Sequence, residues 1–488
     1  MAQLAIKEPG ETPLALDRIL IGGEWRAASG GETLPVISPS DGKQFSRIAR
    51  GTAADIDAAV KAARAAFDGQ WGKTPAVERG RLLLRFSHLI QDHFDELAAL
   101  EARDTGKPMK QARADITATA RYFEFFGGAA DKILGETIPF LNGYQVMILR
   151  EPRGVTGHII PWNYPAQMFG RTLAAGNAVV IKPAEEACLS CLRLAEIAMD
   201  AGIPAGALNV VTGLGEEVGA ALSRHPGLDL LSFTGSPEVG TIVTQAAAVN
   251  HTPVVLELGG KSPQIVFEDA DFDKAIPVVI NAIVQNAGQT CSAGSRVLVQ
   301  QSVYDKFLSR LSERFGKLQV GPHDADLDVG PLITANQKSR VEDFLALAAN
   351  DHLEVAARGT ISPGADPNGF FVTPTLLTRV PDRHKIAQEE VFGPVLAAIP
   401  FSDEADALRV ANGTDYGLVA GIWTENGSRQ MRIAKGVRAG QVFVNGYGAG
   451  GGIELPFGGF KKSGHGREKG LEALREYTVA KTVVFNHG

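Results

Sequence analysis

The spacing of hydrophobic and polar residues changes along the chain. Residues 53–68, 76–104 and 112–127 place apolar side chains three and four positions apart, which predicts amphipathic helices. After residue 152 this spacing gives way to short apolar runs separated by helical stretches. The N-terminal part is therefore predicted to be mainly helical, and the rest to be α/β.

Apolar runs alternate with helical stretches between residues 152 and 260. The runs are 155–160, 178–183, 208–213, 230–235 and 254–259, and the helical stretches are 188–202, 216–225 and 237–250. Strands and helices in this order predict a parallel sheet with helices on its faces. Ligands of such sheets bind beyond the carboxyl ends of the strands, where this chain places several polar residues.

A second alternation of strands and helices follows. Its strands are expected at 263–267, 296–300 and 441–445, and its helices at 271–288 and 302–315. The last apolar run, 478–486, is typical of a strand that is exposed unless it joins another sheet. We expect this strand to be exchanged with a second subunit.

Length and composition are those of a soluble globular enzyme. A chain of 488 residues is too long for one core, so two or three domains are expected. The net charge of −7, without a long basic run, argues against binding to nucleic acid or to an anionic membrane. Three cysteines imply a reducing compartment, and the N-terminus does not resemble a signal peptide. No apolar run approaches the roughly 20 residues of a spanning helix, so a cytoplasmic location is expected.

Cys291 is the candidate nucleophile. It lies in the sequence GQTCS, residues 288–292, among glycine and polar residues that are typical of a loop. A thiol displayed in this way can attack an electrophile, although a small core residue is the alternative. Cys188 and Cys191 lie three apart on a predicted helix without a second pair, which favours core packing over a metal site. The ten histidines show no metal-like spacing either, so no metal is expected.

Two polar residues at predicted strand ends fit the chemistry of a thiol attacking a carbonyl. Asn163 could donate to the oxyanion that forms, or it could simply form a turn after Trp162. Glu257 lies between Leu256 and Leu258, where apolar surroundings raise the proton affinity of a carboxylate and suit a general base. A structural ion pair is the alternative role for Glu257.

Residues that follow two further predicted strands could bind a dinucleotide. The sequence GSPEVG, residues 235–240, follows a strand and opens a helix, whose N-terminus favours an anion. Its spacing is not G-x-G-x-x-G, so the motif alone is weak. Lys182 and Glu185 follow a neighbouring strand. A carboxylate there can accept ribose hydroxyls and would repel a 2′-phosphate, which favours NAD over NADP.

Seven motifs in this order resemble the NAD(P)-dependent aldehyde dehydrogenase superfamily, from about residue 20 to the end. They are PWNYP, KPAEE, FTGSPEVG, LELGGKSP, GQTCSAGSR, EEVFGPV and PFGG with SGHGRE. The resemblance implies four catalytic residues: Cys291 as nucleophile, Asn163 with the Cys291 backbone N–H as oxyanion hole, Glu257 as activator of water, and Glu468 in the proton exit route. It implies a cofactor site of Lys182, Glu185, Pro161, Trp162, Gly235, Ser236, Gly240, Glu390 and Phe392, and no metal.

The resemblance also implies a domain organisation. A Rossmann-type NAD-binding domain would comprise residues 1–127 and 150–258, an α/β catalytic domain residues 259–461, and a small β oligomerisation element residues 128–149 and 476–488. A homodimer or homotetramer would be the functional form. The small-molecule partner would be an aldehyde of small or medium size without a phosphate group.

The implied reaction oxidises the aldehyde to a carboxylic acid through a thiohemiacetal and a thioester on Cys291. A coenzyme A-acylating semialdehyde dehydrogenase is one alternative, but relatives of that kind typically lack the glutamate at position 257. A catalytically impaired binding protein of the same fold is the other alternative.

The chain departs from the family pattern between Asn163 and Lys182, where it is about four residues shorter than usual. Four residues are close to one helical turn, and the missing turn is expected near residues 172–175. The fold should survive, but the helix that lines the substrate route would change. Arg171 adjoins this position, and it could bind a carboxylate or point elsewhere.

Overall fold

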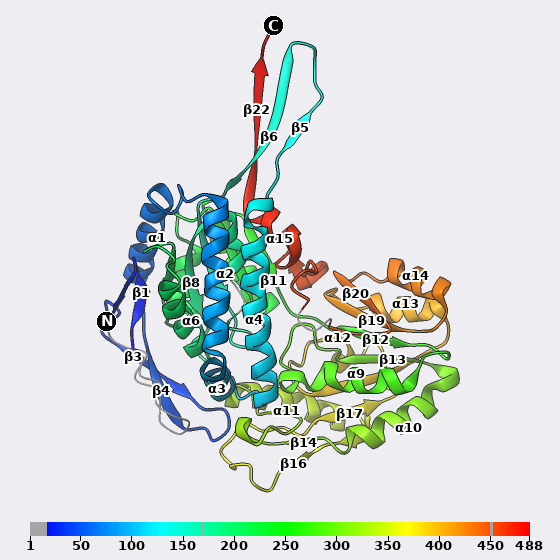
Figure 1. Ribbon diagram of the computed structural model, residues 1–488. Helices are drawn as coiled ribbons and strands as arrows, with labels where there is room; N and C mark the ends of the chain where they lie inside the picture. The colour runs from blue at the N-terminus through cyan, green and yellow to red at the C-terminus, as the bar shows by residue number, and fades with distance from the viewer. Residues whose placement is uncertain (1–16, 167–168, 449–451) are drawn as a thin grey trace.

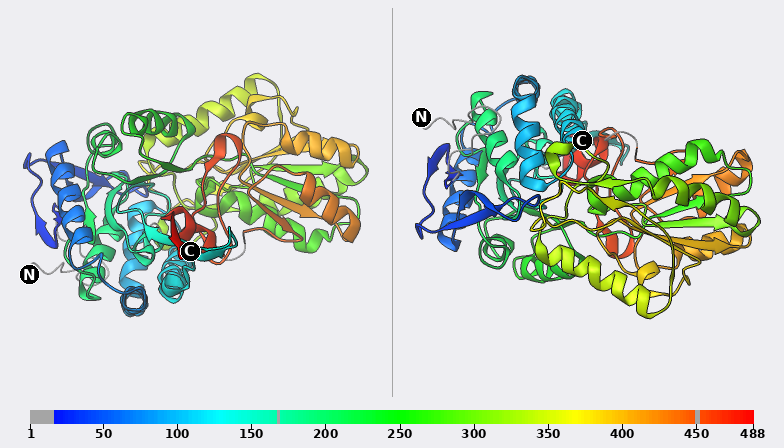
Figure 2. Two further views of the ribbon diagram at one scale, coloured as in Figure 1. Left: turned by 90° about the horizontal axis from the view of Figure 1, so that it is seen from above. Right: turned by 90° about the horizontal axis from the view of Figure 1, so that it is seen from below.

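Two α/β lobes lie side by side, and a thin three-stranded arm projects from the first lobe (Figures 1 and 2). The computed structural model describes residues 17–166, 169–448 and 452–488. Each lobe has its own hydrophobic core. Among the described helices, none combines the length and the apolarity that crossing a membrane requires.

The first lobe is built on a mainly parallel sheet with the strand order β2-β1-β9-β8-β7-β10-β11-β21. The parallel strands are β7 (Val155–Ile160), β8 (Ala178–Pro183), β9 (Leu208–Val210), β10 (Leu230–Thr234) and β11 (Val254–Glu257). The antiparallel edge strands are β1 (Ile19–Ile21), β2 (Glu24–Arg26) and β21 (Gly464–His465). The predicted positions of all five parallel strands are confirmed, because strands covered by helices on both faces leave continuous apolar runs.

Helices cover both faces of this sheet. They are α1 (Ala53–Asp68), α2 (Ala76–Asp92), α3 (Phe94–Thr105), α4 (Met109–Ala129), α5 (Gly170–Ala175), α6 (Leu189–Asp200), α7 (Ala220–Ser223) and α8 (Pro237–Ala248). The prediction of one helix over 76–104 is wrong, since the chain breaks at His93 and restarts as α3. Apolar spacing continues across this break, so the period alone did not reveal it.

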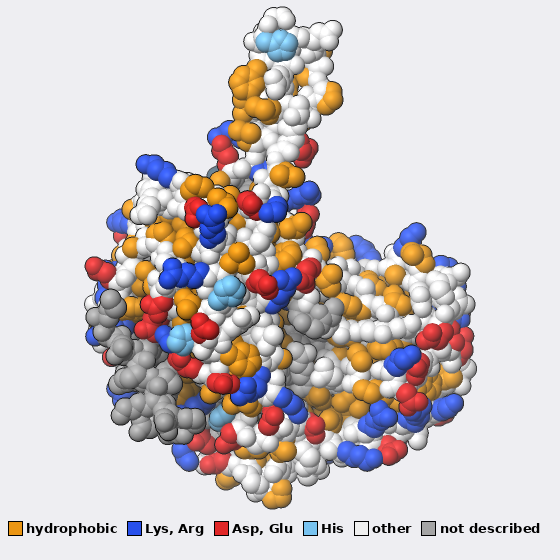
Figure 3. Space-filling view, in the orientation of Figure 1, with side chains coloured by type: hydrophobic (Ala, Val, Ile, Leu, Met, Phe, Trp, Pro, Cys, Tyr) orange, Lys and Arg blue, Asp and Glu red, His pale blue; other side chains and the backbone are white. Residues whose placement is uncertain are grey.

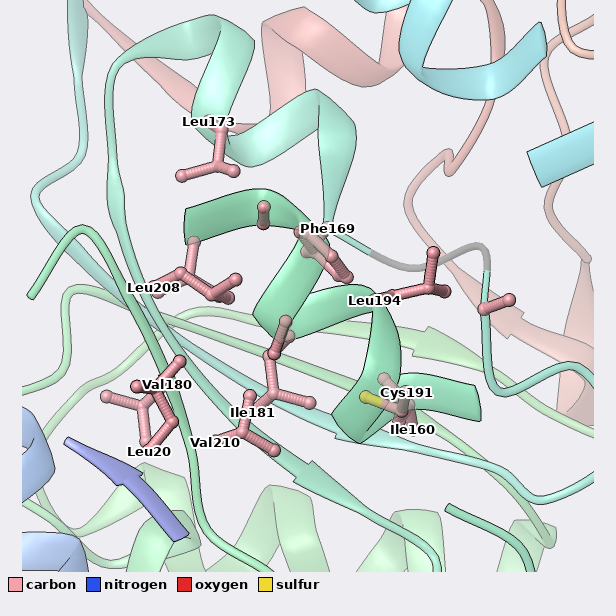
Figure 4. Close-up of a cluster of buried hydrophobic side chains, with 14 of the residues drawn as sticks. Leu20, Ile160, Phe169, Leu173, Val180, Ile181, Cys191, Leu194, Leu208 and Val210 are labelled. Carbon is pink, nitrogen blue, oxygen red and sulfur yellow. The ribbon is translucent and has the colours of Figure 1, made fainter. Parts of the chain in front are cut away.

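Cys188 and Cys191 are fully buried, as the core-packing interpretation predicted. In Figure 4, Cys191 lies among the apolar side chains that fill the space between α6 and the sheet, including Ile181 and Val210.

The second lobe holds a sheet with the order β15-β17-β18-β13-β12-β19-β20. Its strands are β12 (Pro263–Val266), β13 (Arg296–Gln300), β15 (Glu354–Arg358), β17 (Thr375–Thr378), β18 (Val395–Phe401), β19 (Val419–Trp423) and β20 (Gln441–Val444). Its helices are α9 (Phe272–Val284), α10 (Tyr304–Phe315), α11 (Ala335–Asn350), α12 (Lys385–Gln388), α13 (Glu404–Asn412) and α14 (Gly427–Gly436). Short paired strands complete both lobes: β3 (Thr33–Ile37) with β4 (Gln44–Ala49), and β14 (Gln319–Val320) with β16 (Thr360–Ile361).

The helix predicted over 271–288 ends four residues early, at Val284. Asn286 and Ala287 adopt left-handed backbone angles, with φ of 49° and 54°, which end the α-helix. The tight turn that follows, Gln285–Gly288, leads the chain to Cys291.

The arm consists of β5 (Glu136–Ile138), β6 (Tyr144–Pro152) and β22 (Thr478–Asn486) (Figure 1). β22 is antiparallel to β6 along its whole length, from Thr478 opposite Pro152 to Asn486 opposite Tyr144. The C-terminal strand therefore joins a sheet of its own chain, where the sequence led us to expect exchange with a second subunit. Residues 128–149 were expected to belong to the same β element, but the bounds of β6, the strand that receives β22, were not predicted.

Candidate active site

Residues from both lobes meet around one cavity of ≈ 870 Å³. The predicted site residues that line it are Pro161, Trp162, Asn163, Gly235, Ser236, Glu257, Cys291, Glu390, Phe392 and Glu468. Several of them follow the carboxyl ends of β7, β10 and β11, which are parallel and therefore end at the same edge of the first sheet. The topology thus explains why residues far apart in the sequence share one cavity.

Cys291 lies on a turn before β13 and is partly exposed, in agreement with the loop prediction. Its carbonyl packs against Gly260, where an added Cβ would lie 2.2 Å from the Cys291 oxygen. Burial, together with the carboxylates of Glu257 and Glu390, raises the pKa of the Cys291 thiol to about 12. The thiol is therefore neutral at rest and must lose its proton when it attacks.

Asn163 is held from two sides. Its side-chain amide donates to the carbonyl of Gln289 at 3.0 Å, and its own backbone carbonyl accepts from the ammonium of Lys107 at 3.0 Å. Lys107 is fully buried and also bonds to Glu101 at 2.9 Å and Asp115 at 2.8 Å. An amide nitrogen carries two protons, so one remains for an oxyanion after the bond to Gln289.

Glu257 ends β11 and is buried, with 1% of its surface exposed. Within the described part of the chain, neither of its carboxylate oxygens has a hydrogen-bond partner. Burial and, second, the charge of Glu468 raise the pKa of Glu257 well above its ordinary value, while Arg171, Arg467 and Lys469 lower it by less. Such a carboxyl accepts a proton readily near neutral pH.

Arg171 does not point to a substrate carboxylate but forms a buried ion pair with Glu468. Its Nη2 donates to Glu468 Oε1 at 2.8 Å and to the Tyr477 hydroxyl at 3.0 Å. Its Nη1 donates to the Tyr122 hydroxyl at 2.9 Å. α5, which carries Arg171, has six residues, so the shortened segment still forms a helix and turns this side chain inward.

The pairing of β21 with β11 brings Glu468 close to Glu257. Glu257 lies opposite Gly464 in this pair, and the Glu468 amide then donates to the carbonyl of Phe457 at 2.8 Å. The C-terminal segment thus joins the edge of the first sheet next to its carboxyl end.

Glu390 and Phe392 come from the second lobe. Glu390 Oε1 accepts the N–H of Gly260 at 2.9 Å, and burial raises the pKa of Glu390 to about 7. Phe392 meets Trp162 edge to face, with ring centroids 5.7 Å apart. These contacts join the two lobes across the cavity.

Ser236 caps the N-terminus of α8, where its hydroxyl accepts the N–H of Val239 at 3.3 Å. Lys182, near the carboxyl end of β8, bonds to Glu185, which follows this strand, and Glu185 Oε1 also accepts the N–H of Gly215 at 3.1 Å. These two residues do not line the ≈ 870 Å³ cavity but lie at the end of a neighbouring strand.

Gly240, the last glycine of the predicted GSPEVG motif, does not line the ≈ 870 Å³ cavity. This residue lies inside α8, and a Cβ there would come within 2.8 Å of Leu258 Cδ2. The absence of a side chain lets the helix pack closely against the residue that follows β11. The place of Gly240 in the cofactor site stays a prediction.

Sequence analysis missed Lys107, Tyr122, Tyr447 and Tyr477. Lys107 follows a predicted helix directly after a glycine, and a buried lysine there gave no periodic signal. The three tyrosines act through hydroxyl bonds to residues distant in the sequence, which no spacing reveals. No cluster of histidine, cysteine, aspartate and glutamate suited to a metal ion occurs among the described residues.

Known proteins resemble this chain over nearly its whole length. The profile of the aldehyde dehydrogenase family matches residues 25–483. The chain belongs to this family. Mitochondrial benzaldehyde dehydrogenase of Antirrhinum majus is 43% identical, with 99% of this chain and 92% of the relative covered.

Solved structures give the same assignment. A candidate aldehyde dehydrogenase from Burkholderia cenocepacia is 62% identical with a TM-score of 0.95, covering 96% of this chain and 100% of the other. An NAD+ complex of a Bacillus cereus aldehyde dehydrogenase is 39% identical with a TM-score of 0.94, covering 96% of each chain. The protein is an oxidoreductase that acts on aldehydes.

The contacts of Glu468 predict a pH effect in this aldehyde dehydrogenase. Glu468→Gln keeps an oxygen for Arg171 but removes the negative charge that raises the pKa of Glu257. The pKa of Glu257 should fall, so more of the base is deprotonated at low pH. The acidic limb of the kcat–pH profile should move to lower pH by about one unit.

Glu472→Gln is the matched control, because Glu472 is exposed on α15 (Gly470–Glu476) and pairs with Arg475. Its profile should equal that of the parent enzyme. An acidic limb that stays in place, or moves to higher pH, in Glu468→Gln would contradict the coupling.

Proposed function

We propose that this enzyme oxidises a small or medium-sized, non-phosphorylated aldehyde to the free carboxylic acid, with NAD as cofactor and Cys291 as the acyl carrier. The observation that carries the proposal is the convergence of Cys291, Asn163 and Glu257 on one cavity. A thiol, an amide donor and a buried carboxyl are the groups that acyl chemistry at an aldehyde needs.

The first half of the reaction uses Cys291 and Asn163. The thiol passes its proton to water, which carries it to solvent, as Sγ bonds to the carbonyl carbon, and the carbonyl oxygen becomes an oxyanion. The amide of Asn163 and the backbone N–H of Cys291 donate to that oxygen. Bound NAD supplies the hydride acceptor, and a thioester remains on Cys291.

The second half uses Glu257. Its carboxylate takes a proton from a water molecule, whose oxygen bonds to the thioester carbon. The carbon–sulfur bond then breaks and Glu257 gives its proton to the departing sulfur, which releases the carboxylic acid and returns both the thiol and the carboxylate. The raised pKa of Glu257 suits this step, since a stronger base removes the proton more readily.

Several residues fit an NAD molecule. The N-terminus of α8 at Ser236 suits the pyrophosphate, and Glu390 with Phe392 would orient the nicotinamide ribose. Lys182 and Glu185 would hold the adenosine ribose. NAD+ is present in the Bacillus cereus relative and in a betaine aldehyde dehydrogenase of Staphylococcus aureus that is 36% identical.

Two alternatives have less support. A coenzyme A-acylating enzyme has no use for a base that activates water, whereas Glu257 is present and buried in the cavity. A non-catalytic binding protein has no need for a thiol, an amide and a carboxyl around one cavity.

Cys291→Ala should abolish NADH formation from an aldehyde. Glu257→Gln should still give a first burst of NADH, because acylation precedes hydrolysis, while steady turnover falls about 100-fold or more. Stopped-flow absorbance of NADH, with and without coenzyme A, measures both quantities.

Cys191→Ala is the control, since Cys191 is a fully buried core residue, and it should retain activity. Undiminished turnover in Cys291→Ala would end the thiol mechanism. A dependence of turnover on coenzyme A would favour the acylating alternative, and NAD binding without turnover across a broad aldehyde panel would favour the binding protein.

Preference for NAD over NADP is assigned to Glu185, whose carboxylate is fixed by Lys182 and Gly215. Glu185→Gln removes the repulsion of a 2′-phosphate. The ratio of kcat/KM for NAD to that for NADP should fall about tenfold, a difference of about 1.4 kcal/mol. Glu216→Gln, an exposed neighbour, should leave the ratio unchanged, and an unchanged ratio in Glu185→Gln would refute the assignment.

The arm is proposed to join the subunits of a homodimer or homotetramer. The NAD-binding domain is proposed to comprise residues 1–127 and 150–258, and the catalytic domain residues 259–461. Hydrophobic side chains are exposed along it (Figure 3), including Phe140 at 61%, Leu141 at 63% and Phe485 at 48%. Exposed apolar side chains on a protruding sheet are typical of an interface.

Phe140→Asp with Leu141→Asp should shift the molar mass in solution toward that of a single chain, because burying two carboxylates is unfavourable. Light scattering after size exclusion measures this. A parent enzyme that is already monomeric would contradict the proposal.

A cytoplasmic location, in keeping with three free cysteines, is also proposed, and fractionation of the source cells would test it.

A further inference from the structure

Tyr447 forms part of the cavity wall in the segment that follows β20. Its ring lies 5.9 Å from that of Phe443, centroid to centroid. Gly421 in β19 leaves room for it, since a Cβ there would lie 3.2 Å from Tyr447 Cδ2. The ring is thus seated between the second sheet and the cavity.

The hydroxyl of Tyr447 donates to the backbone carbonyl of Ser292 at 2.5 Å. Ser292 directly follows Cys291 in the chain. Other bonds of this turn involve its neighbours: Ala293 N–H donates to the Thr290 carbonyl at 3.0 Å, and Gly294 N–H to the Ala282 carbonyl at 2.9 Å. Tyr447 therefore holds the peptide next to the nucleophile from outside the turn.

The other components of the site are fixed independently of Tyr447. Gly260 packs against the Cys291 carbonyl, and Asn163 is bonded to the carbonyl of Gln289. The oxyanion needs two donors at once, the Asn163 amide and the Cys291 N–H. Reacting groups must be held within about 0.5 Å of their working geometry, so a small shift of the turn at residues 290–293, which carries both the Cys291 N–H and the Ser292 carbonyl, would separate these donors.

We propose that the Tyr447 hydroxyl is a positioning group for the oxyanion hole. Through the Ser292 carbonyl it sets the orientation of the turn that carries the Cys291 N–H and thiol relative to Asn163. This inference rests on the proposed role of Cys291 as nucleophile. It also gives the segment after β20 a role beyond forming the wall of the cavity.

Tyr447→Phe separates positioning from wall formation, because it keeps the ring and removes only the hydroxyl. The rate of the NADH burst should fall about tenfold, the loss that corresponds to one buried hydrogen bond. KM for NAD should stay within about twofold, since no proposed cofactor contact is changed. A role in wall shape alone would leave the burst rate of Tyr447→Phe at that of the parent enzyme.

A double-mutant cycle with Asn163→Ala tests the coupling directly. If Tyr447 acts by aligning the two donors, its loss should cost no more than about twofold once the Asn163 amide is gone. Equal tenfold losses in both backgrounds, or no loss in either, would overturn the proposal. The burst rate is compared among the parent enzyme, Tyr447→Phe, Asn163→Ala and the double variant.

Tyr304→Phe is the matched control. Tyr304 is another buried tyrosine of the second lobe, its hydroxyl bonds to Thr378 and accepts the N–H of Arg379, and none of these residues lines the cavity. Removal of this hydroxyl should leave the burst rate unchanged. An active Cys291→Ala variant would end the nucleophile assignment itself, whereas a normal Tyr447→Phe beside an inactive Cys291→Ala would overturn only the positioning role.

Discussion

The ion pair between Arg171 and Glu468 is the interaction on which the active site depends. Both side chains are almost completely buried, and a buried charge is tolerated only with a partner of good geometry. Tyr122 from α4 and Tyr477 before β22 complete the bonds of Arg171. One guanidinium thus connects the helices of the first lobe to the C-terminal segment and fixes the negative charge that raises the pKa of Glu257.

The same cavity changes the proton affinity of two groups, the Cys291 thiol and the Glu257 carboxyl. Burial raises the pKa of the Cys291 thiol and also that of the Glu257 carboxyl. The raised pKa of Glu257 suits a later step, the removal of a proton from the water that hydrolyses the thioester.

Much of the fold could be predicted from the sequence wherever an element leaves a clear pattern of apolar residues. The strands at 155–160, 178–183 and 478–486 match the structure to the residue, because they leave uninterrupted apolar runs or a clear alternation. The break at His93 left no trace in the hydrophobic period. The left-handed residues after α9 were equally hidden, since Asn286 and Ala287 belong to no turn signature.

The candidate site divides in the same way. Residues at strand ends, such as Asn163 and Glu257, could be placed because parallel strands end at a common edge. The partner of Arg171 could not, because Glu468 is 297 positions away and reaches it only through the pairing of β21 with β11. The hydroxyl bond of Tyr447 to Ser292 spans 155 positions and needs the packed second lobe.

The central claim is that Cys291 carries the acyl group. The most direct measurement is peptide mass spectrometry of Glu257→Gln enzyme, quenched in acid during turnover with NAD and an aldehyde that the parent enzyme oxidises. The peptide containing Cys291 is predicted to gain the mass of the corresponding acyl group, while the peptide containing Cys188 and Cys191 does not. NADH formation without an adduct on Cys291, or an adduct on another residue, would contradict it.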